Sequence, residues 1–232
     1  MTWVKLCGIT SADEVRICSE AGADALGFVV DFPADVPWNL SIDEAERLMG
    51  QVRDGVERVV VAGDDADLVA AQLERLRPHA VQLHADEPPE ATRRIAAVAH
   101  AVGCRVMKAL RFAVESGDVL SAHRTHPDPV AAAGEMLALG VDEVLLDSVS
   151  RTQAAGTGRT IDFAVARRIR DAVAAPVVLA GGLTPHNVAL AIEAVGPHGV
   201  DVISGVETRR RVKHPARVRA FIANARGTRR EP

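Results

Sequence analysis

The 232 residues suffice for one large domain, and a hydrophobic content of 48% is that of a globular protein. The net charge of −4 argues against a nucleic acid or an acidic membrane surface as the main partner. Three cysteines without metal-binding spacing indicate free thiols in a reducing compartment, so we expect a cytoplasmic protein. There is no signal-peptide pattern, and no run approaches the roughly 20 apolar residues that cross a membrane.

Short β-branched runs alternate along the chain with longer segments of helical spacing. Eight runs are predicted as strands, at 3–7, 25–30, 58–62, 80–84, 105–110, 143–147, 176–180 and 200–204. This alternation predicts right-handed βαβ units and a parallel sheet. Eight such units in a chain of this length predict an α/β fold, a closed (β/α)8 TIM barrel, as one domain over residues 1–232.

A weak repeat supports this arrangement. The sequences AGAD (21–24), LGVD (139–142) and HGVD (198–201) each follow a predicted helix and precede a predicted strand. In each, glycine would end the helix in a left-handed turn and aspartate would open the strand. We expect these loops at the bottom of the barrel, where they stabilise the fold.

The two last βα units carry a predicted phosphate site. Gly181 and Gly182 follow the seventh strand, before a helix start predicted at Thr184 and Pro185, and Ser204 and Gly205 end the eighth. Glycines let backbone N–H groups approach an anion closely, and these loops are the usual phosphate site of a TIM barrel. The alternative is that both are tight turns only.

Two residues at the same end of the predicted strands could move protons. Cys7 ends the first strand, where a thiol could act as nucleophile or base, because its free pKa lies within reach of neutral pH and nearby cations could lower it. Asp147 ends the sixth strand, on the opposite side of the ring, where it could act as the acid. The alternatives are an inert buried cysteine, as expected for Cys18 and Cys104, and a helix cap for the aspartate.

Three further side chains share the predicted interior. Gln82 and His84 alternate on the fourth strand and point to one face, although a lone histidine is as often purely structural. Lys5 shares a face with Cys7 and could form a buried ion pair or help the thiol to ionise.

The chain resembles phosphoribosylanthranilate isomerases, the (β/α)8 enzymes of tryptophan biosynthesis. The resemblance is collinear and includes VKLCGIT (4–10), AGADALGFVV (21–30), VQLHADE (81–87), MKALR (107–111), LLDS (145–148), GTGRTIDF (156–163), LAGGLTPHNV (179–188) and GVDVISGVE (199–207). It implies an Amadori rearrangement of a sugar phosphate in which Cys7 is the general base and Asp147 the general acid. It implies no cofactor and no metal, because both steps are proton transfers. We expect a monomer or homodimer.

One departure from the family affects the expected substrate. Trp38 stands where the family has an arginine that helps to hold anthranilate, and an indole cannot pair with a carboxylate as a guanidinium does. The preceding loop, 31–37, is longer and more acidic, with Asp31 and Asp35, so repulsion is expected there. Ala85 also replaces a family glycine. Arg111, after the fifth strand, could compensate.

Two alternatives follow. The same chemistry could act on a different N-ribosylamine 5-phosphate, which retained acid and base with an altered loop would predict. A non-catalytic barrel that binds a phosphorylated metabolite is the other, and the presence of both Cys7 and Asp147 argues against it.

Overall fold

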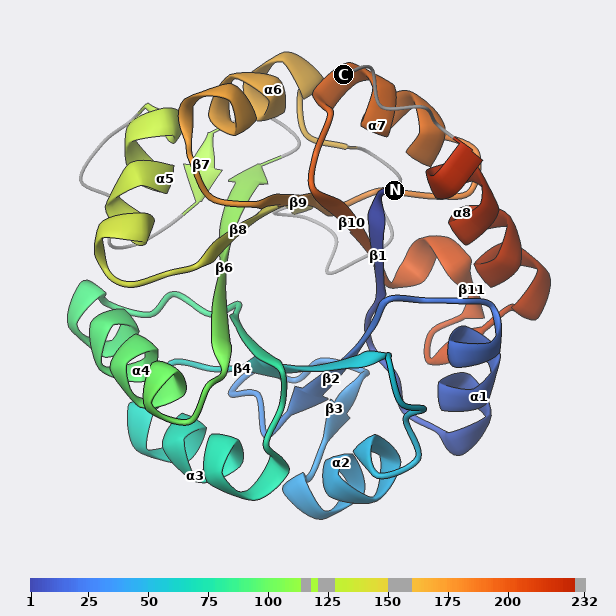
Figure 1. Cartoon of the computed structure of the whole chain (residues 1–232), viewed down its shortest axis with the longest axis horizontal. Coiled ribbons are helices and arrows are strands. Elements are labelled where there is room, and N and C mark those ends of the chain that lie inside the picture. Colours follow the sequence, from blue (N-terminus) through green and yellow to red (C-terminus); the bar gives the residue numbers. More distant parts are fainter. Residues whose placement is uncertain (114–117, 121–127, 150–159, 228–232) are drawn as a thin grey trace.

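In this computed structural model, which describes residues 1–113, 118–120, 128–149 and 160–227, a closed ring of parallel strands is surrounded by helices (Figure 1). The ring runs in the order β1, β10, β9, β8, β6, β5, β4, β2 and closes because β1 pairs with both β10 and β2. Its strands are β1 (Trp3–Leu6), β2 (Ala25–Val30), β4 (Glu57–Ala62), β5 (Ala80–Leu83), β6 (Arg105–Ala113), β8 (Glu143–Val149), β9 (Val177–Leu179) and β10 (Gly199–Val202). The predicted TIM barrel is confirmed.

The outer layer consists of one helix after each strand of the ring. These helices are α1 (Ala12–Glu20), α2 (Ile42–Met49), α3 (Ala66–Leu76), α4 (Pro89–Ala101), α5 (Pro129–Ala138), α6 (Phe163–Ala172), α7 (Val188–Val195) and α8 (Pro215–Gly227). Local signals fix their starts, as in α2, where Ser41 and Glu44 form a capping box. No helix in the described ranges is long and apolar enough to span a bilayer.

Four short strands were not predicted, because two- or three-residue pairings leave no periodic signal. Two extend the main sheet: β3 (Asn39–Leu40) pairs with β2, and β7 (Val119–Leu120) pairs with β6. The other two, β11 (Glu207–Arg209) and β12 (Val212–Lys213), form a hairpin between β10 and α8. Part of the family-like motif at 156–163 lies outside the described residues.

Each strand of the ring faces helices on one side and the interior on the other. Val4 and Leu6 of β1 join the large apolar core under the helices, whereas Trp3, Lys5 and Cys7 turn inward. Alternation along a strand enforces this division. Both faces of these strands are buried. This agrees with their sequences, which are nearly continuous runs of β-branched and small aliphatic residues.

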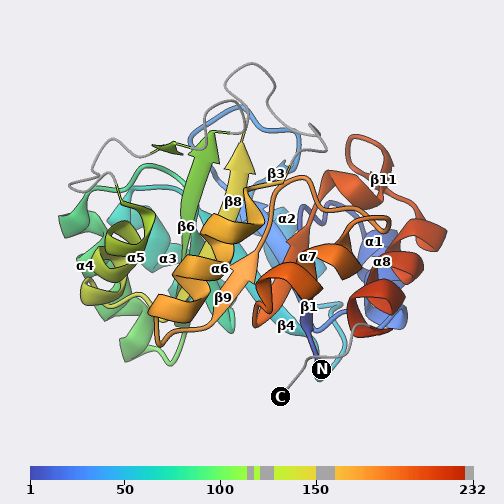
Figure 2. The same ribbon diagram turned by 90° about the horizontal axis from the view of Figure 1, so that it is seen from above.

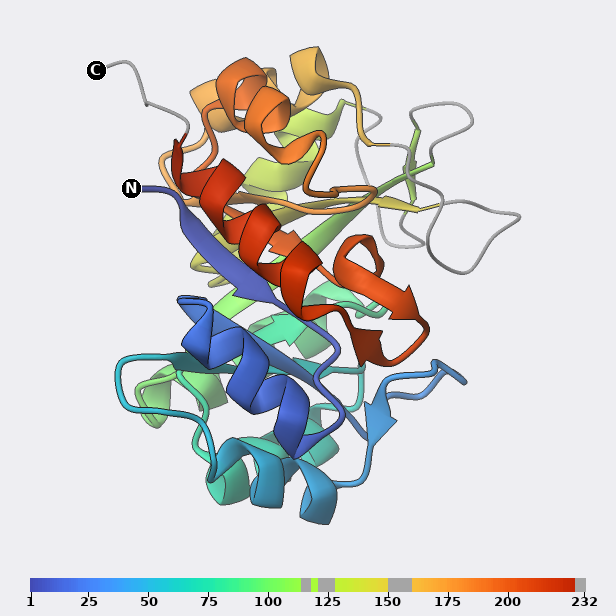
Figure 3. The same ribbon diagram turned by 90° about the vertical axis from the view of Figure 1, so that its right-hand side faces the viewer.

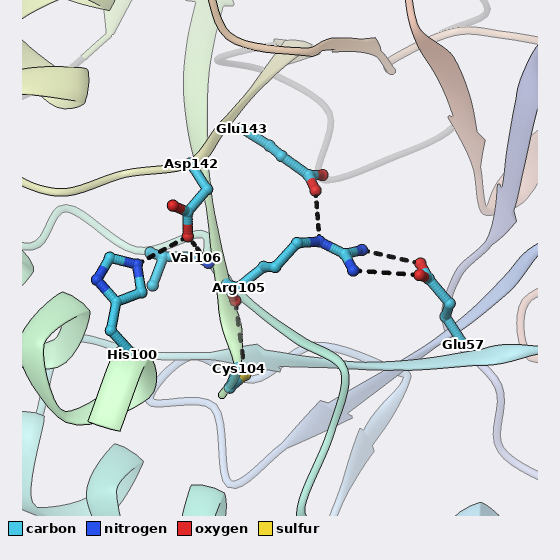
Figure 4. A network of polar contacts seen from close by, with 7 residues as sticks. All are labelled: Glu57, His100, Cys104, Arg105, Val106, Asp142 and Glu143. Atoms are coloured by element: carbon cyan, nitrogen blue, oxygen red, sulfur yellow. Dashed lines mark hydrogen bonds and ion pairs between the residues drawn. The ribbon is translucent and has the colours of Figure 1, made fainter. Parts of the chain in front are cut away.

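A charged network crosses the bottom of the barrel, at the starts of three strands (Figure 4). The Arg105 guanidinium at the start of β6 donates to Glu143 of β8 at 2.8 Å and to both carboxylate oxygens of Glu57 of β4, at 3.2 and 2.9 Å. The same figure shows Asp142 accepting from Val106 N–H at 2.7 Å. The bottom of the ring is thus joined by polar contacts that lie away from the strands' carboxyl ends.

The repeated Gly-x-Asp loops agree with expectation in two cases out of three. Gly22 and Gly140 have φ of +90° and +92°, and Asp24 accepts a 2.8 Å hydrogen bond from Val4 N–H as Asp142 does from Val106. The third case was wrong. Gly199 and Asp201 lie inside β10, and the aspartate points into the barrel, because here the helix ends three residues earlier at Gly196.

The carboxyl ends of the strands all emerge on one side of the molecule, uppermost in Figure 2, where β6 and β8 extend furthest. Figure 3 shows α1 and α8 packed side by side across the junction of the first and last strands. This end of the barrel is where the predicted site residues should meet.

Candidate active site

A cavity of about 360 Å³ opens at the carboxyl ends of the strands. Ten of the eleven predicted site residues line it: Cys7, Trp38, Gln82, His84, Arg111, Asp147, Gly181, Gly182, Ser204 and Gly205. The eleventh, Lys5, lies below the cavity and is fully buried. Residues separated by up to 198 positions in the sequence therefore share one pocket because the ring closes β1 against β10.

Cys7 directly follows β1 and is held by the pairing of the first and last strands. Its N–H donates to Val202 O at 3.0 Å, and only 1% of the residue is exposed. The neighbouring strand leaves room for the thiol, since a Cβ at Gly27 would lie 2.5 Å from Cys7 Sγ. A side chain at position 27 would therefore displace the sulfur.

Beneath the thiol, Lys5 Nζ pairs with Asp201 Oδ2 at 2.7 Å, and both side chains are buried. Burial alone would disfavour the ammonium ion, but the Asp201 carboxylate and Cys7 together raise the pKa of Lys5. Burial raises the pKa of the Cys7 thiol, and the Lys5 cation partly opposes that rise. Lys5 thus stays charged, and its cation reduces the rise in the pKa of Cys7 that burial causes.

Asp147 belongs to a polar chain that crosses from β8 to β5. His84 Nε2 lies 3.4 Å from Asp147 Oδ2, and His84 Nδ1 lies 3.1 Å from Gln82 Nε2. If the Gln82 amide donates, His84 carries its proton on Nε2 and faces the carboxyl group with it. In the ring, Asp147 lies three strands away from Cys7, so the two groups face one cavity from different sides.

The two glycine loops form the third side of the cavity. Gly181 and Gly182 have φ of +75° and +63°, which favour glycine, and a Cβ at 181 would lie 2.7 Å from Asp147 Oδ1. Gly205 lies in a short 3-10 helix (Ser204–Val206) after β10, where a Cβ would lie 1.9 Å from Leu183 O. The loops therefore touch backbone to backbone, in the manner of an anion-binding site.

The helix after the first glycine loop starts later than predicted. It begins at Val188 rather than at Thr184, because Asn187 first closes a turn. The Asn187 side chain accepts from Thr184 N–H at 2.7 Å and donates to Gly182 O at 3.0 Å. This turn fixes the loop that carries the two glycines.

The loop after β2 forms an apolar wall. Asn39 holds it closed through two 2.9 Å hydrogen bonds with the backbone of Phe32. Phe32 and Val36 then pack with Trp38 against Cys7, Val29 and Val61. Of the described residues on this loop, Phe32, Ala34, Val36 and Trp38 line the cavity, whereas Asp31 and Asp35 do not. The two acids therefore do not contact the cavity directly, and repulsion of a negatively charged substrate by this loop stays a prediction.

Trp38 itself is 6% exposed and fixed by a buried contact. Its Nε1–H donates to Glu207 Oε1 at 2.8 Å, and the same oxygen accepts from Lys213 Nζ at 2.8 Å. Gly8 lets the indole approach, since a Cβ there would lie 2.8 Å from Trp38 Cδ1.

Sequence reasoning missed three residues that shape this site. Asp201 lines the cavity and pairs with Lys5, Gly27 makes room for the thiol, and Glu207 holds the indole. A lysine within an apolar strand does signal a buried carboxylate partner, but the partner's position requires the strand register.

Comparison with known proteins agrees with this geometry. The family model described as N-(5′-phosphoribosyl)anthranilate isomerase matches residues 4–224. The chain belongs to this family. The N-(5′-phosphoribosyl)anthranilate isomerase of Halobacterium salinarum is 40% identical over 232 residues, which cover 98% of this chain and 97% of the relative.

Solved structures of the same family superimpose over nearly the whole chain. Phosphoribosylanthranilate isomerase from Thermotoga maritima has a TM-score of 0.79 and 31% identity, covering 98% of this chain and all of that one. A structure of the family's enzyme in complex with reduced 1-(o-carboxyphenylamino)-1-deoxyribulose 5-phosphate has a TM-score of 0.76 and 30% identity, with the same coverage.

Proposed function

We propose that the chain isomerises N-(5-phosphoribosyl)anthranilate to 1-(2-carboxyphenylamino)-1-deoxyribulose 5-phosphate, an aldose–ketose isomerisation in tryptophan biosynthesis. The observation that carries this proposal is one cavity shared by a thiol, a carboxyl group and two touching glycine loops. Membership of the isomerase family supports it.

Asp147 is the proposed general acid. Its carboxyl group would give a proton to the furanose ring oxygen, so that the bond from that oxygen to C1′ breaks and a Schiff base forms between C1′ and the amine. His84, 3.4 Å from the carboxyl group, is a positioning residue in this proposal, and Gln82 orients the imidazole in turn.

Cys7 is the proposed general base. As thiolate it would take the proton from C2′, and the electron pair of that C–H bond would convert the Schiff base to an enolamine. The enolamine then tautomerises to the 1-amino-1-deoxyketose. Lys5 supports this step because its ammonium ion, held by Asp201, favours the thiolate inside a buried site.

The remaining groups would bind the substrate. Gly181, Gly182, Ser204 and Gly205 line the cavity together, and in this proposal their backbone N–H groups hold the 5′-phosphate. The apolar wall that includes Trp38 suits an aromatic ring. Since each chemical step is a proton transfer, the mechanism requires no cofactor and no metal.

Turnover of freshly prepared phosphoribosylanthranilate, followed as loss of its fluorescence, tests the proposal. Cys7→Ala and Asp147→Asn should each lower kcat by at least about 100-fold, because each removes a proton-transfer group. Cys18→Ala is the matched control, since Cys18 is also a buried thiol but is not among the residues that line the cavity. Absence of turnover by folded wild-type protein, or full activity of Cys7→Ala, would contradict the proposal.

Four broader predictions accompany it. We propose that residues 1–232 form a single domain, and that the protein acts as a monomer or homodimer on a small phosphorylated substrate. A cytoplasmic location agrees with three free, buried cysteines. Neither a nucleic acid nor a membrane is expected as partner, given the net charge of −4.

A further inference from the structure

The cavity is divided between apolar and polar walls. Trp38, Phe32, Val36 and Val29 line the side next to β2 and β4. The facing side, built from β5, β6 and β8, carries Gln82, His84, Arg111 and Asp147. An aromatic ring with one charged substituent would fit this division if the ring lay on the first side and the charge pointed toward the second.

Trp38 cannot supply a positive charge to pair with a substrate carboxylate, and its one hydrogen-bond donor is already engaged. The Trp38 Nε1–H is bonded to Glu207, whose charge is balanced by the buried ammonium of Lys213. The indole therefore lines the cavity as an apolar surface, packed in one cluster with Ile203 and close to Gly8.

Arg111, unlike Trp38, can supply a positive charge to a bound anion. Among the described residues that line the cavity, it is the one with a permanent positive charge. The other nearby cations, Lys5 and Lys213, are each held in a buried pair at 2.7 and 2.8 Å. Arg111 forms a loose ion pair with Asp86, in which Nη2 lies 3.8 Å from Oδ1, a distance too long for a hydrogen bond.

The backbone fixes Arg111 better than a loop would. It pairs with Asp147 of β8 on one side and with Leu120 of β7 on the other. Its side chain is 26% exposed, so it is partly withdrawn from water. An anion that binds the Arg111 guanidinium forms a charge-assisted hydrogen bond, which is stronger where water is partly excluded.

We infer that Arg111 binds the carboxylate of the substrate's aromatic amine, while Trp38 provides the surface on which the ring packs. This inference rests on the proposed function and assigns specificity within it. With the positive charge supplied from the end of β6, a neutral aromatic residue at position 38 is compatible with a carboxylated substrate.

Two ligands separate the two roles. One is reduced 1-(2-carboxyphenylamino)-1-deoxyribulose 5-phosphate, and the other is the same compound with phenyl in place of carboxyphenyl. Calorimetry on the folded full chain gives both dissociation constants. Arg111→Gln should weaken binding of the carboxylated ligand by at least about tenfold and leave the phenyl ligand within about twofold. Trp38→Ala should weaken both ligands.

Arg94→Gln is the matched control, because Arg94 lies on α4, pairs with Asp67 and is absent from the cavity lining. Equal loss of both ligands in Arg111→Gln, or no loss of either, would overturn the inference. If Arg111→Gln does not fold, Arg111→Lys keeps the charge but not the paired donors, and it should selectively weaken the carboxylated ligand to a smaller extent.

The same experiments distinguish the two proposals. Wild-type protein that neither binds the carboxylated ligand nor turns over phosphoribosylanthranilate contradicts the proposed function. Wild-type protein that does both, with an Arg111→Gln variant that shows no selective loss, contradicts only the assignment of Arg111.

Discussion

Replacement of Lys5 by methionine tests the charged pair beneath the thiol. Methionine keeps most of the length of the side chain but leaves the Asp201 carboxylate buried without its cation, which was 2.7 Å away. Loss of one partner from a buried pair costs about 3–5 kcal/mol in the free energy of unfolding. For a domain of this size the melting temperature should fall by roughly 6–20 °C.

A double-mutant cycle separates the pair from its surroundings. Asp201→Leu removes the other charge, and in Lys5→Met/Asp201→Leu neither charge of this pair remains, so much of the lost stability should return. Activity should not return, since the thiol then lacks the neighbouring cation that favours its ionised form. Chemical unfolding followed by circular dichroism, together with turnover, measures both effects.

An exposed pair of similar length serves as the control. Arg75 Nη2 lies 2.6 Å from Asp43 Oδ1, but the two side chains are 41% and 78% exposed. Water screens such a pair, so Arg75→Gln should change the unfolding midpoint very little. A Lys5→Met variant no less stable than Arg75→Gln, or a double variant less stable than both single ones, would refute the reasoning.

Three other changes test the geometry of the cavity. Gly27→Ala adds a methyl group where a Cβ lies 2.5 Å from Cys7 Sγ, so kcat should fall by about 100-fold while circular dichroism still shows a folded barrel. Because burial raises the pKa of Cys7 and the thiolate is the base, kcat/KM should rise with pH, and a flat profile between about pH 7 and 9 would count against this role. Gly205→Ala forces a Cβ to within 1.9 Å of Leu183 O, so KM for the sugar phosphate should rise roughly tenfold, and an unchanged KM would mean that the phosphate binds elsewhere.

The barrel was predictable because its signals are local and repeated. Each strand of the ring is a short apolar run, and each is followed by a segment of helical period. The boundaries were less predictable: β6 runs to Ala113 and β8 to Val149, beyond the apolar runs at 105–110 and 143–147, because they pair with each other along their length. The length of such a strand depends on how it is aligned with its neighbour, and sequence patterns do not give that alignment.

The positions of the candidate site residues were predictable for the same reason, since the end of each strand points to one face. The contacts that these residues make with other side chains were not predictable. Trp38 donates to Glu207, 169 residues later, and no local pattern in either segment indicates that pairing. Asp201 was interpreted as a strand-opening residue, whereas the register of β10 against β1 turns it inward toward Lys5. Ala85 replaces a family glycine, but it is not among the described residues with positive φ.

Contacts between the two ends of the chain also have a consequence for synthesis and folding. Lys5 meets Asp201, Trp38 meets Glu207, and Glu14 accepts from Lys213 N–H, across separations of 196, 169 and 199 residues. An emerging chain that lacks its last strand holds Lys5 without a partner and Trp38 without its anchor. The environment of Cys7 is therefore completed only when the ring closes, and recovery of activity during refolding should follow the slowest, longest-range step rather than the formation of helices.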